Sequence, residues 1–287
     1  MQGFTESFKI HLASRYANFQ ANSLATGISS TMNLLPHLRL ITTLAGLSLL
    51  ALGQASAQST QNSWGSQTLV HGLLWDVHEV TVAQVKEFAN QTGFVSLAEK
   101  EGGGQIYEAG FVQKKGWTWR APFGKPAQDL EPAVHITFDE AQQICRFKGR
   151  RLPTDTEWVK AAFWEQRDNP PPGYVKGQRY PYPMGSSAKQ SHCLSGCGNY
   201  PGSAPQGSLW RGVGHVPVMT TPPGVNGLFD MGGNVWEWVD TGTGDEKITR
   251  GASWWYDADR QKESDVATKP KDTRVGYIGF RCIQDLK

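Results

Sequence analysis

Three stretches of the chain place apolar residues at helical spacing soon after a threonine. The apolar positions follow an i, i+3, i+4 pattern at Val85, Phe88 and Ala89, at Ala141, Ile144 and Cys145, and at Trp158, Ala161 and Ala162. Each threonine is followed three residues later by Gln or Glu, in Thr81-x-x-Gln84, Thr137-x-x-Glu140 and Thr154-x-x-Glu157. This capping box satisfies free backbone donors where a helix begins. The pattern predicts three short helices whose apolar faces belong to the core and carry no catalytic role.

The remaining sequence shows little periodicity. Residues 99–129 are rich in glycine and contain Tyr107, Trp117 and Trp119, which is typical of a long functional loop. Residues 168–187 are rich in proline and predict an exposed surface excursion. Eleven Trp and 32 Gly fit an aromatic, loop-heavy chain, and no flavin, haem or NAD motif is present. These patterns alone indicate an α+β, loop-rich domain.

The N-terminal part predicts export. An apolar run from Leu40 to Leu52 follows Arg39 and precedes Ala55-Ser56-Ala57, the order of a Sec-type secretory signal. Met32 gives a signal of normal length, so we expect translation to start there. Residues 1–57 are then an extension plus signal peptide, and 58–287 form one mature domain in the periplasm, or secreted as the alternative. The apolar run is too short for a stop-transfer helix, so no membrane span is expected in the mature form.

Charge excludes some partners. The chain carries 28 basic and 26 acidic residues, and removing residues 1–57, with three basic and one acidic, leaves 25 of each. A neutral balance gives no electrostatic basis for binding nucleic acid or an anionic membrane surface.

Four cysteines, Cys145, Cys193, Cys197 and Cys282, lie in the part predicted to be exported. An oxidising compartment favours disulfides, and four cysteines allow three pairings. A zinc site is the alternative, but only His192 is adjacent to a cysteine. Disulfides are therefore the favoured interpretation.

The stretch from Gly227 to Trp238 combines carboxylates with glycines. Asp230 and Glu237 lie seven residues apart, and Gly232-Gly233 between them lets the backbone turn its carbonyls inward. Calcium takes six to eight oxygen ligands in flexible geometry and suits such a set. The alternative is a tight turn with two tryptophans packed beneath it.

Five motifs in order resemble the formylglycine-generating-enzyme (FGE)/sulfatase-modifying-factor family and cover about residues 76–283. They are Glu79-Val80-Thr81 with Thr92-Gly93-Phe94, Arg151-Leu152-Pro153-Thr154-Asp155-Thr156-Glu157-Trp158, the stretch Gly227–Trp238, Arg250-Gly251-Ala252-Ser253-Trp254, and Gly279-Phe280-Arg281-Cys282. The resemblance implies a C-type-lectin-like α+β fold with a small twisted antiparallel sheet, few short helices and much loop. It also implies a Cys145–Cys282 bridge, which leaves Cys193 and Cys197 to close a short loop.

The resemblance further implies a structural calcium ion. Its ligands would be the side chains of Asp230 and Glu237 and the backbone carbonyls of Gly233 and Val235. A second family site would begin at Asn199, but no carboxylate stands near Trp210–Gly212 to complete it.

The chain departs from the family at its chemistry. Formylglycine-generating members use two cysteines that bind copper(I) and the substrate thiol, and soft thiolate ligands suit that ion. The matching positions hold Tyr256 and Gln261, and no cysteine lies between residues 198 and 281. We therefore expect no copper and no conversion of cysteine to formylglycine.

A polar and aromatic segment remains at the equivalent place. Candidate catalytic residues are Tyr256, Asp257, Asp259, Arg260 and Glu263, and candidate substrate-binding residues are Ser253, Trp254 and Trp255. A carboxylate beside aromatic walls can act as a general acid or base. The alternative is a solvated, charge-balanced loop.

Two function classes follow from the resemblance. Family members without the cysteine pair include a periplasmic protein that matures the siderophore pyoverdine, converting dihydropyoverdine to pyoverdine. The chain would then be an oxidoreductase-type enzyme acting on a small peptide-siderophore precursor. The other class is a non-catalytic envelope module that binds a ligand or partner, because fold does not establish function.

Overall fold

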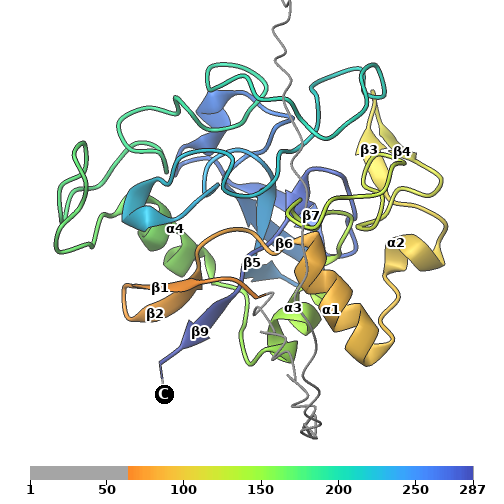
Figure 1. Ribbon diagram of the computed structural model, residues 1–287, viewed down its shortest axis with the longest axis horizontal. Coiled ribbons are helices and arrows are strands. Elements are labelled where there is room, and N and C mark those ends of the chain that lie inside the picture. The colour runs from red at the N-terminus through yellow and green to blue at the C-terminus, as the bar shows by residue number, and fades with distance from the viewer. Residues whose placement is uncertain (1–63, 287) are drawn as a thin grey trace, which may run out of the picture. The chain divides into compact units, whose positions relative to one another are not determined.

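A computed structural model describes residues 64–286 of the 287-residue chain (Figure 1). The predicted signal segment, the Met32 start and the boundary after residue 57 lie outside the described residues and stay predictions.

Four helices begin at side-chain caps, and three of them are those predicted. They are α1 (Val82–Thr92), α2 (Leu97–Lys100), α3 (Phe138–Phe147) and α4 (Asp155–Phe163). All three predicted capping boxes are present, and the unpredicted α2 has the same device in Ser96 and Glu99. Gly93 adopts φ 71° and ends α1, as expected of a residue without a Cβ.

The strands form three small sheets rather than one. Their bounds are β1 (Gln67–Val70), β2 (Leu73–Asp76), β3 (Gln105–Tyr107), β4 (Phe111–Gln113), β5 (Trp236–Thr243), β6 (Glu246–Arg250), β7 (Ala267–Pro270), β8 (Ile278–Gly279) and β9 (Ile283–Asp285). The orders are β1-β2-β9, β3-β4 and β7-β6-β5-β8. The antiparallel pairing that was expected is present in each sheet, and β5 also pairs with β8 in parallel. The predicted long loop 99–129 contains the β3–β4 hairpin.

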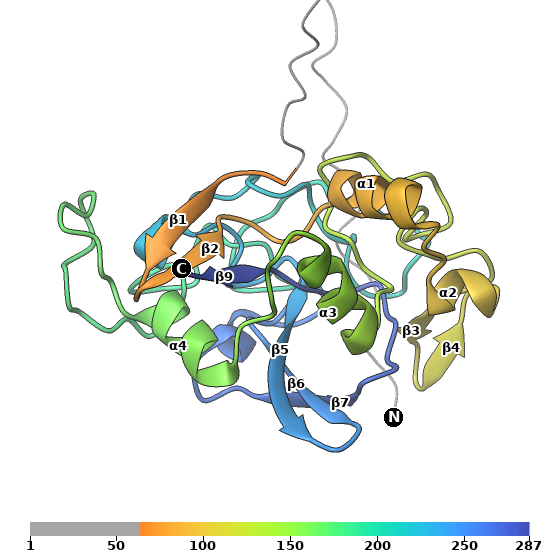
Figure 2. The same ribbon diagram turned by 90° about the horizontal axis from the view of Figure 1, so that it is seen from below.

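The core lies between the helices and the β5–β6 pair (Figure 2). Helices α1 and α3 pack together through Phe88 and Phe147, whose ring centroids are 5.3 Å apart. Phe138 of α3 meets Trp238 of β5 edge-on at 6.0 Å. Such edge-to-face pairs add about 0.5–1.5 kcal/mol beyond the burial of their area. The chain is an α+β fold in which short elements are held by large aromatic side chains.

Both expected disulfides are present. Cys145 of α3 bonds Cys282 just before β9 across 137 residues, and Cys193 bonds Cys197 across four. Closing the long loop in the unfolded chain is worth about 5 kcal/mol and the short one about 2 kcal/mol in the chain-entropy model. The long bridge therefore ties the helical side of the fold to the C-terminal strand, whereas the short bridge contributes less than half as much.

No helix or strand occurs within residues 164–224 of the described chain. This span runs across the top of Figure 1, in green and blue-green. It ends at the 3-10 turn η1 (Val225–Gly227), where Asn226 donates to the carbonyls of Ala161 and Trp164. These bonds cap the C-terminal carbonyls of α4 and anchor the irregular span, whose stretch 168–187 is largely exposed as predicted.

Candidate functional site

The segment after β6 carries every residue predicted to act on a substrate. The chain turns at Gly251 (φ 95°) and Ala252 (φ 65°), and the backbone N–H of Trp254 then donates to the carbonyl of Asn234. A short 3-10 turn, η2 (Ala258–Gln261), follows. The hydrogen bond between Trp254 and Asn234 attaches the segment to the Gly227–Trp238 stretch.

Three of the predicted substrate-binding residues are buried. Ser253 is fully buried, and Trp254 and Trp255 are 1% and 2% exposed. Trp254 donates its indole N–H to the carbonyl of Gly276, and Trp255 stacks on Tyr277 at 5.9 Å. The sequence predicted that these side chains contact a substrate, whereas in the structure they are buried and pack in the core.

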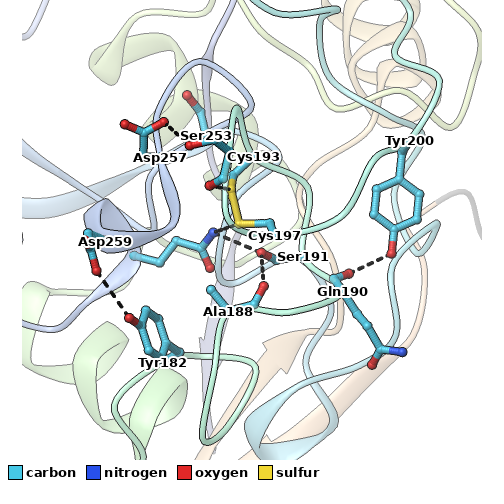
Figure 3. The surroundings of a disulfide bond; sticks show 12 residues. Tyr182, Ala188, Gln190, Ser191, Cys193, Cys197, Tyr200, Ser253, Asp257 and Asp259 are labelled. Atoms are coloured by element: carbon cyan, nitrogen blue, oxygen red, sulfur yellow. Dashed lines mark hydrogen bonds between the residues drawn. A yellow bond between two sulfur atoms is a disulfide. The ribbon is translucent and has the colours of Figure 1, made fainter.

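The predicted acid/base residues point to separate partners. Asp257 accepts from Ser195, Asp259 pairs with Lys262, Arg260 pairs with Asp265, and Glu263 pairs with Arg179. Figure 3 shows Asp257 and Asp259 facing different neighbours. The four groups do not converge on one reacting atom, which corrects the single charged pocket expected from the sequence.

Two of these acids differ in their setting. The ammonium of Lys262 lowers the pKa of the exposed Asp259, so this carboxylate is a weaker base than an ordinary aspartate. Glu263 lines an open pocket of about 430 Å³ with Arg179, Tyr180 and Lys262. This pocket is polar at its rim, and Glu263 is already neutralised there by the guanidinium of Arg179.

A different surface gathers aromatic rings around an arginine. We call it the Trp210 face; its members are Tyr107, Phe111, Trp210, Arg211 and Tyr256. Tyr107 and Phe111 meet edge-on at 5.5 Å, and the indole N–H of Trp210 donates to the Tyr107 carbonyl. The Trp210 ring in turn lies edge-on to Trp255 at 5.6 Å. Trp210 is 62% exposed, which is unusual for so large an apolar side chain.

Arg211 lies over the inner rings of this face. Its guanidinium carbon is 5.7 Å from the Trp255 ring and 6.0 Å from the Tyr256 ring, within cation–π range. Among residues 64–286, its recorded contacts are with these rings and no carboxylate pairs with it. Gly212 makes this approach possible, because a Cβ there would lie 2.8 Å from the Trp254 ring. The face thus offers an unneutralised cation on an aromatic floor.

Tyr256 contributes a neutral hydroxyl to this face. Burial raises its pKa, an effect that the hydrogen bond with Tyr277 and the nearby guanidinium groups only partly oppose. The phenol therefore stays protonated at neutral pH and can donate a hydrogen bond.

The side chains of the predicted calcium site face protein donors. Asp230 accepts from the Thr221 hydroxyl and from the backbone N–H of Met219. Both oxygens of Glu237 accept from Arg281, and one also accepts from the Trp158 indole. A cation already meets Glu237, so this arrangement does not fit a calcium ion, and the calcium site stays a prediction for measurement.

The other predicted ligands are the backbone carbonyls of Gly233 and Val235. The hydrogen bonds shown for these residues are made by their N–H groups, to the Gly251 carbonyl and to Glu79. Asn199, expected to begin a second site, is exposed. Within residues 64–286, no group of three or more His, Cys, Asp or Glu side chains is placed to hold a metal ion.

The buried acids form a cluster around one arginine. Glu79, Asp230 and Glu237 are each at most 1% exposed, and Arg281 is fully buried. Burial raises the pKa of Glu79 well above its ordinary value, and the neighbouring carboxylates add to the effect. Sequence reasoning took Asp230 and Glu237 as ligands, but their setting is that of a structural network.

Comparison with known proteins identifies the family of the chain. Residues 39–286 match the family model described as the sulfatase-modifying factor enzyme 1-like domain, FGE-sulfatase. The chain belongs to this family. It is 23% identical to the mouse formylglycine-generating enzyme, with 95% of this chain and 81% of that protein covered. It is 30% identical to the mouse inactive C-alpha-formylglycine-generating enzyme 2, with 72% and 73% covered.

Among solved structures, the fold resembles that of PvdO from Pseudomonas aeruginosa. The TM-score is 0.51 at 16% identity, with 75% of this chain and 80% of that chain covered. This likeness concerns the fold alone.

All four cysteines of the chain lie in the two disulfides. The correspondence of Tyr256 and Gln261 with the cysteine pair of formylglycine-generating members stays a prediction. No helix among residues 64–286 is long and apolar enough to cross a membrane.

Proposed function

We propose that the protein binds a planar, negatively charged aromatic compound on the Trp210 face and does not make formylglycine. The observation that carries this proposal is Arg211, a guanidinium without an acidic partner among the described residues, held over the rings of Trp255 and Tyr256. A flat ring can stack on the exposed indole of Trp210 while its anionic oxygens meet the guanidinium.

The compound we propose is the dihydropyoverdine chromophore of a peptide siderophore precursor, met in the periplasm. This chromophore is a flat catechol-bearing ring and matches the aromatic floor and the cation. Its oxidation removes two electrons and two protons, and dioxygen is the acceptor we propose, giving hydrogen peroxide. Arg211 would orient the catechol oxygens and the Tyr256 hydroxyl would donate to one of them.

The second candidate is a non-catalytic envelope module that only binds such a compound or a partner. The separation of Asp257, Asp259 and Glu263 favours it, because each of these three carboxylates is held by a different partner outside the Trp210 face. The similarity to a relative named inactive is compatible with it.

The test adds purified protein to dihydropyoverdine in air and follows both chromophore fluorescence and hydrogen peroxide. Trp210→Ala should lose any acceleration, whereas Trp164→Ala is the matched control. Trp164 is also an exposed indole beside an arginine, but its neighbour Arg179 is paired with Glu263. Acceleration that only Trp210→Ala abolishes supports catalysis. Tight binding without acceleration supports the non-catalytic module. If the compound neither binds nor is oxidised faster, the proposal is refuted.

A further inference from the structure

The Cys193–Cys197 disulfide is joined directly to the segment that carries Tyr256. The N–H of Leu194 donates to the Tyr256 carbonyl at 2.9 Å, and the N–H of Ala258 donates to the Ser195 carbonyl at 3.0 Å. The Ser195 hydroxyl also donates to Asp257 at 2.6 Å. Three hydrogen bonds therefore link the small disulfide loop to residues 256–258 (Figure 3).

The first sulfur lies in a setting that suits a thiol. Cys193 is 6% exposed, and its Sγ is 3.0 Å from the Ser195 carbonyl oxygen. A thiol can donate a hydrogen bond to that carbonyl, whereas a disulfide sulfur has no proton to donate. The Ser195 carbonyl already accepts from the Ala258 N–H, and it can accept a second hydrogen bond from the Cys193 thiol when the bridge is open.

The second sulfur meets a buried amide. Gln261 is 1% exposed, and its Nε2 donates to the Ser191 hydroxyl at 2.9 Å and to Cys197 Sγ at 3.1 Å. The Ser191 hydroxyl donates to the Ala188 carbonyl, so its oxygen needs a donor and fixes which way the amide points. Figure 3 shows Ser191 and Cys197 side by side.

The other end of the amide has no partner. Gln261 Oε1 is buried and accepts no hydrogen bond within the described chain, and it lies so close to Gly232 that a Cβ there would be 2.6 Å away. A buried orphan acceptor costs free energy. Because Ser191 holds the amide with Nε2 toward Cys197, a Cys197 thiolate can keep the bond from Nε2.

We propose that Cys193–Cys197 is a thiol–disulfide exchange site for a thiol of low molecular weight, and that the closed bridge holds segment 256–261 in place. The half-buried Cys197 is the sulfur that an incoming thiolate reaches first, because Cys193 is covered. Exposed disulfides of this kind are the labile ones, unlike bridges in a core.

The exchange balances without a cofactor. A thiolate attacks Cys197 Sγ, a mixed disulfide forms, and Cys193 leaves as a thiolate that takes up a proton and donates to the Ser195 carbonyl. A second thiolate then attacks the sulfur of the small thiol and releases Cys197. Two thiols are oxidised to one small disulfide, and the two electrons reduce the bridge to two thiols.

The experiment titrates the full-length oxidised protein with glutathione, traps free thiols by alkylation, and quantifies each cysteine by peptide mass spectrometry. The fully buried Cys145–Cys282 bridge is the internal control. We expect Cys193–Cys197 to open at a glutathione concentration at least about tenfold lower, with the mixed disulfide on Cys197. Opening of both bridges together, or a mixed disulfide on Cys193 alone, overturns the proposal.

Two further measurements distinguish thiol–disulfide exchange from a purely structural role of this bridge. Gln261→Leu should raise the glutathione needed for half-opening by about fivefold, the value of roughly one hydrogen bond, while Gln91→Leu on the surface of α1 should not. Amide hydrogen exchange should speed up in residues 256–261 when only this bridge is open. Unchanged exchange there would show that the bridge does not hold the segment, whatever the ligand of the Trp210 face.

Discussion

Arg281 binds both carboxylate oxygens of Glu237 in the interior of the protein. Nε lies 2.8 and 2.9 Å from the two oxygens, and Nη2 is 2.6 Å from one of them. The remaining donors of Arg281 reach the carbonyls of Asp76 and Phe229. This one guanidinium therefore links β2, the Gly227–Trp238 stretch and the C-terminal strand.

Removing Arg281 should lower stability, because Glu79, Asp230 and Glu237 would lose the one cation that lies beside them within residues 64–286. We expect Arg281→Met to lower the free energy of unfolding by about 3–5 kcal/mol in urea denaturation. Arg281→Met combined with Glu237→Leu should lose less, since the carboxylate that is hydrogen-bonded to Arg281 is removed with it and only Glu79 and Asp230 stay buried. Lys86→Met is the control, because its pair with Asp129 is exposed and worth under about 1 kcal/mol. Equal losses in the single and double variants would contradict this account.

Calcium gives a second test of the same geometry. Because Arg281 already neutralises Glu237, and Asp230 has two protein donors, we expect the melting temperature to be unchanged between EGTA and millimolar calcium. Differential scanning fluorimetry in both buffers, with magnesium as the control ion, makes the comparison. A saturable rise with calcium that Asp230→Ala abolishes would instead establish the site predicted from the sequence.

The pH dependence of the free energy of unfolding should report the ionisation of Asp76. Burial raises the pKa of Asp76 from 3.8 to about 7, against the opposing guanidinium of Arg150, and its Oδ2 accepts no hydrogen bond within residues 64–286. A raised pKa means that the folded state holds the proton and the unfolded state does not. The stability that the protonated Asp76 carboxyl contributes is therefore fully present below the unfolded pKa of 3.8. It is lost as the pH rises through the folded pKa of about 7.

We expect the free energy of unfolding to fall as the pH rises toward about 7, by at most about 1.4 kcal/mol per pH unit for one proton, and to level off above it. Asp76→Asn should flatten this slope. Asp285→Asn should not, because Arg151 lowers the pKa of the exposed Asp285 and keeps it ionised throughout. Below pH 6.5 the buried histidines oppose the trend, since burial lowers the pKa of His135 to about 4. An equal slope in wild type and Asp76→Asn would refute the assignment.

The helices could be predicted because their signals are local. A threonine, a Gln or Glu three residues later and apolar residues within one turn define each predicted helix, and the structure confirms all three. Ser96 and Glu99 make the same box, but α2 is four residues long and has no apolar repeat after it. The parallel β5–β8 pair joins residues about forty apart, which no local pattern encodes.

The site was predicted less well because the role of a side chain depends on partners that are distant in sequence. Glu237 resembles a metal ligand until Arg281, 44 residues later, is brought against it. Trp255 resembles a substrate wall until Tyr277 stacks on it, and Trp254 until Phe123 meets it edge-on. The Trp210-Arg211 pair was passed over, although a tryptophan beside an arginine in a glycine- and serine-rich loop is a signal that could have been followed.

Arg211 should determine affinity for anionic aromatic ligands, whatever the final reaction. We expect Arg211→Gln to weaken binding of a catechol-bearing chromophore by about tenfold or more, the loss of one charge-assisted contact. Arg260→Gln is a matched control, because Arg260 also lies near the Tyr256 ring, at 5.7 Å, but is paired with Asp265. Quenching of tryptophan fluorescence during titration with dihydropyoverdine reports the affinity of each variant. The same loss in both variants would mean that general positive charge governs binding. No loss in Arg211→Gln would remove the guanidinium of the Trp210 face from recognition.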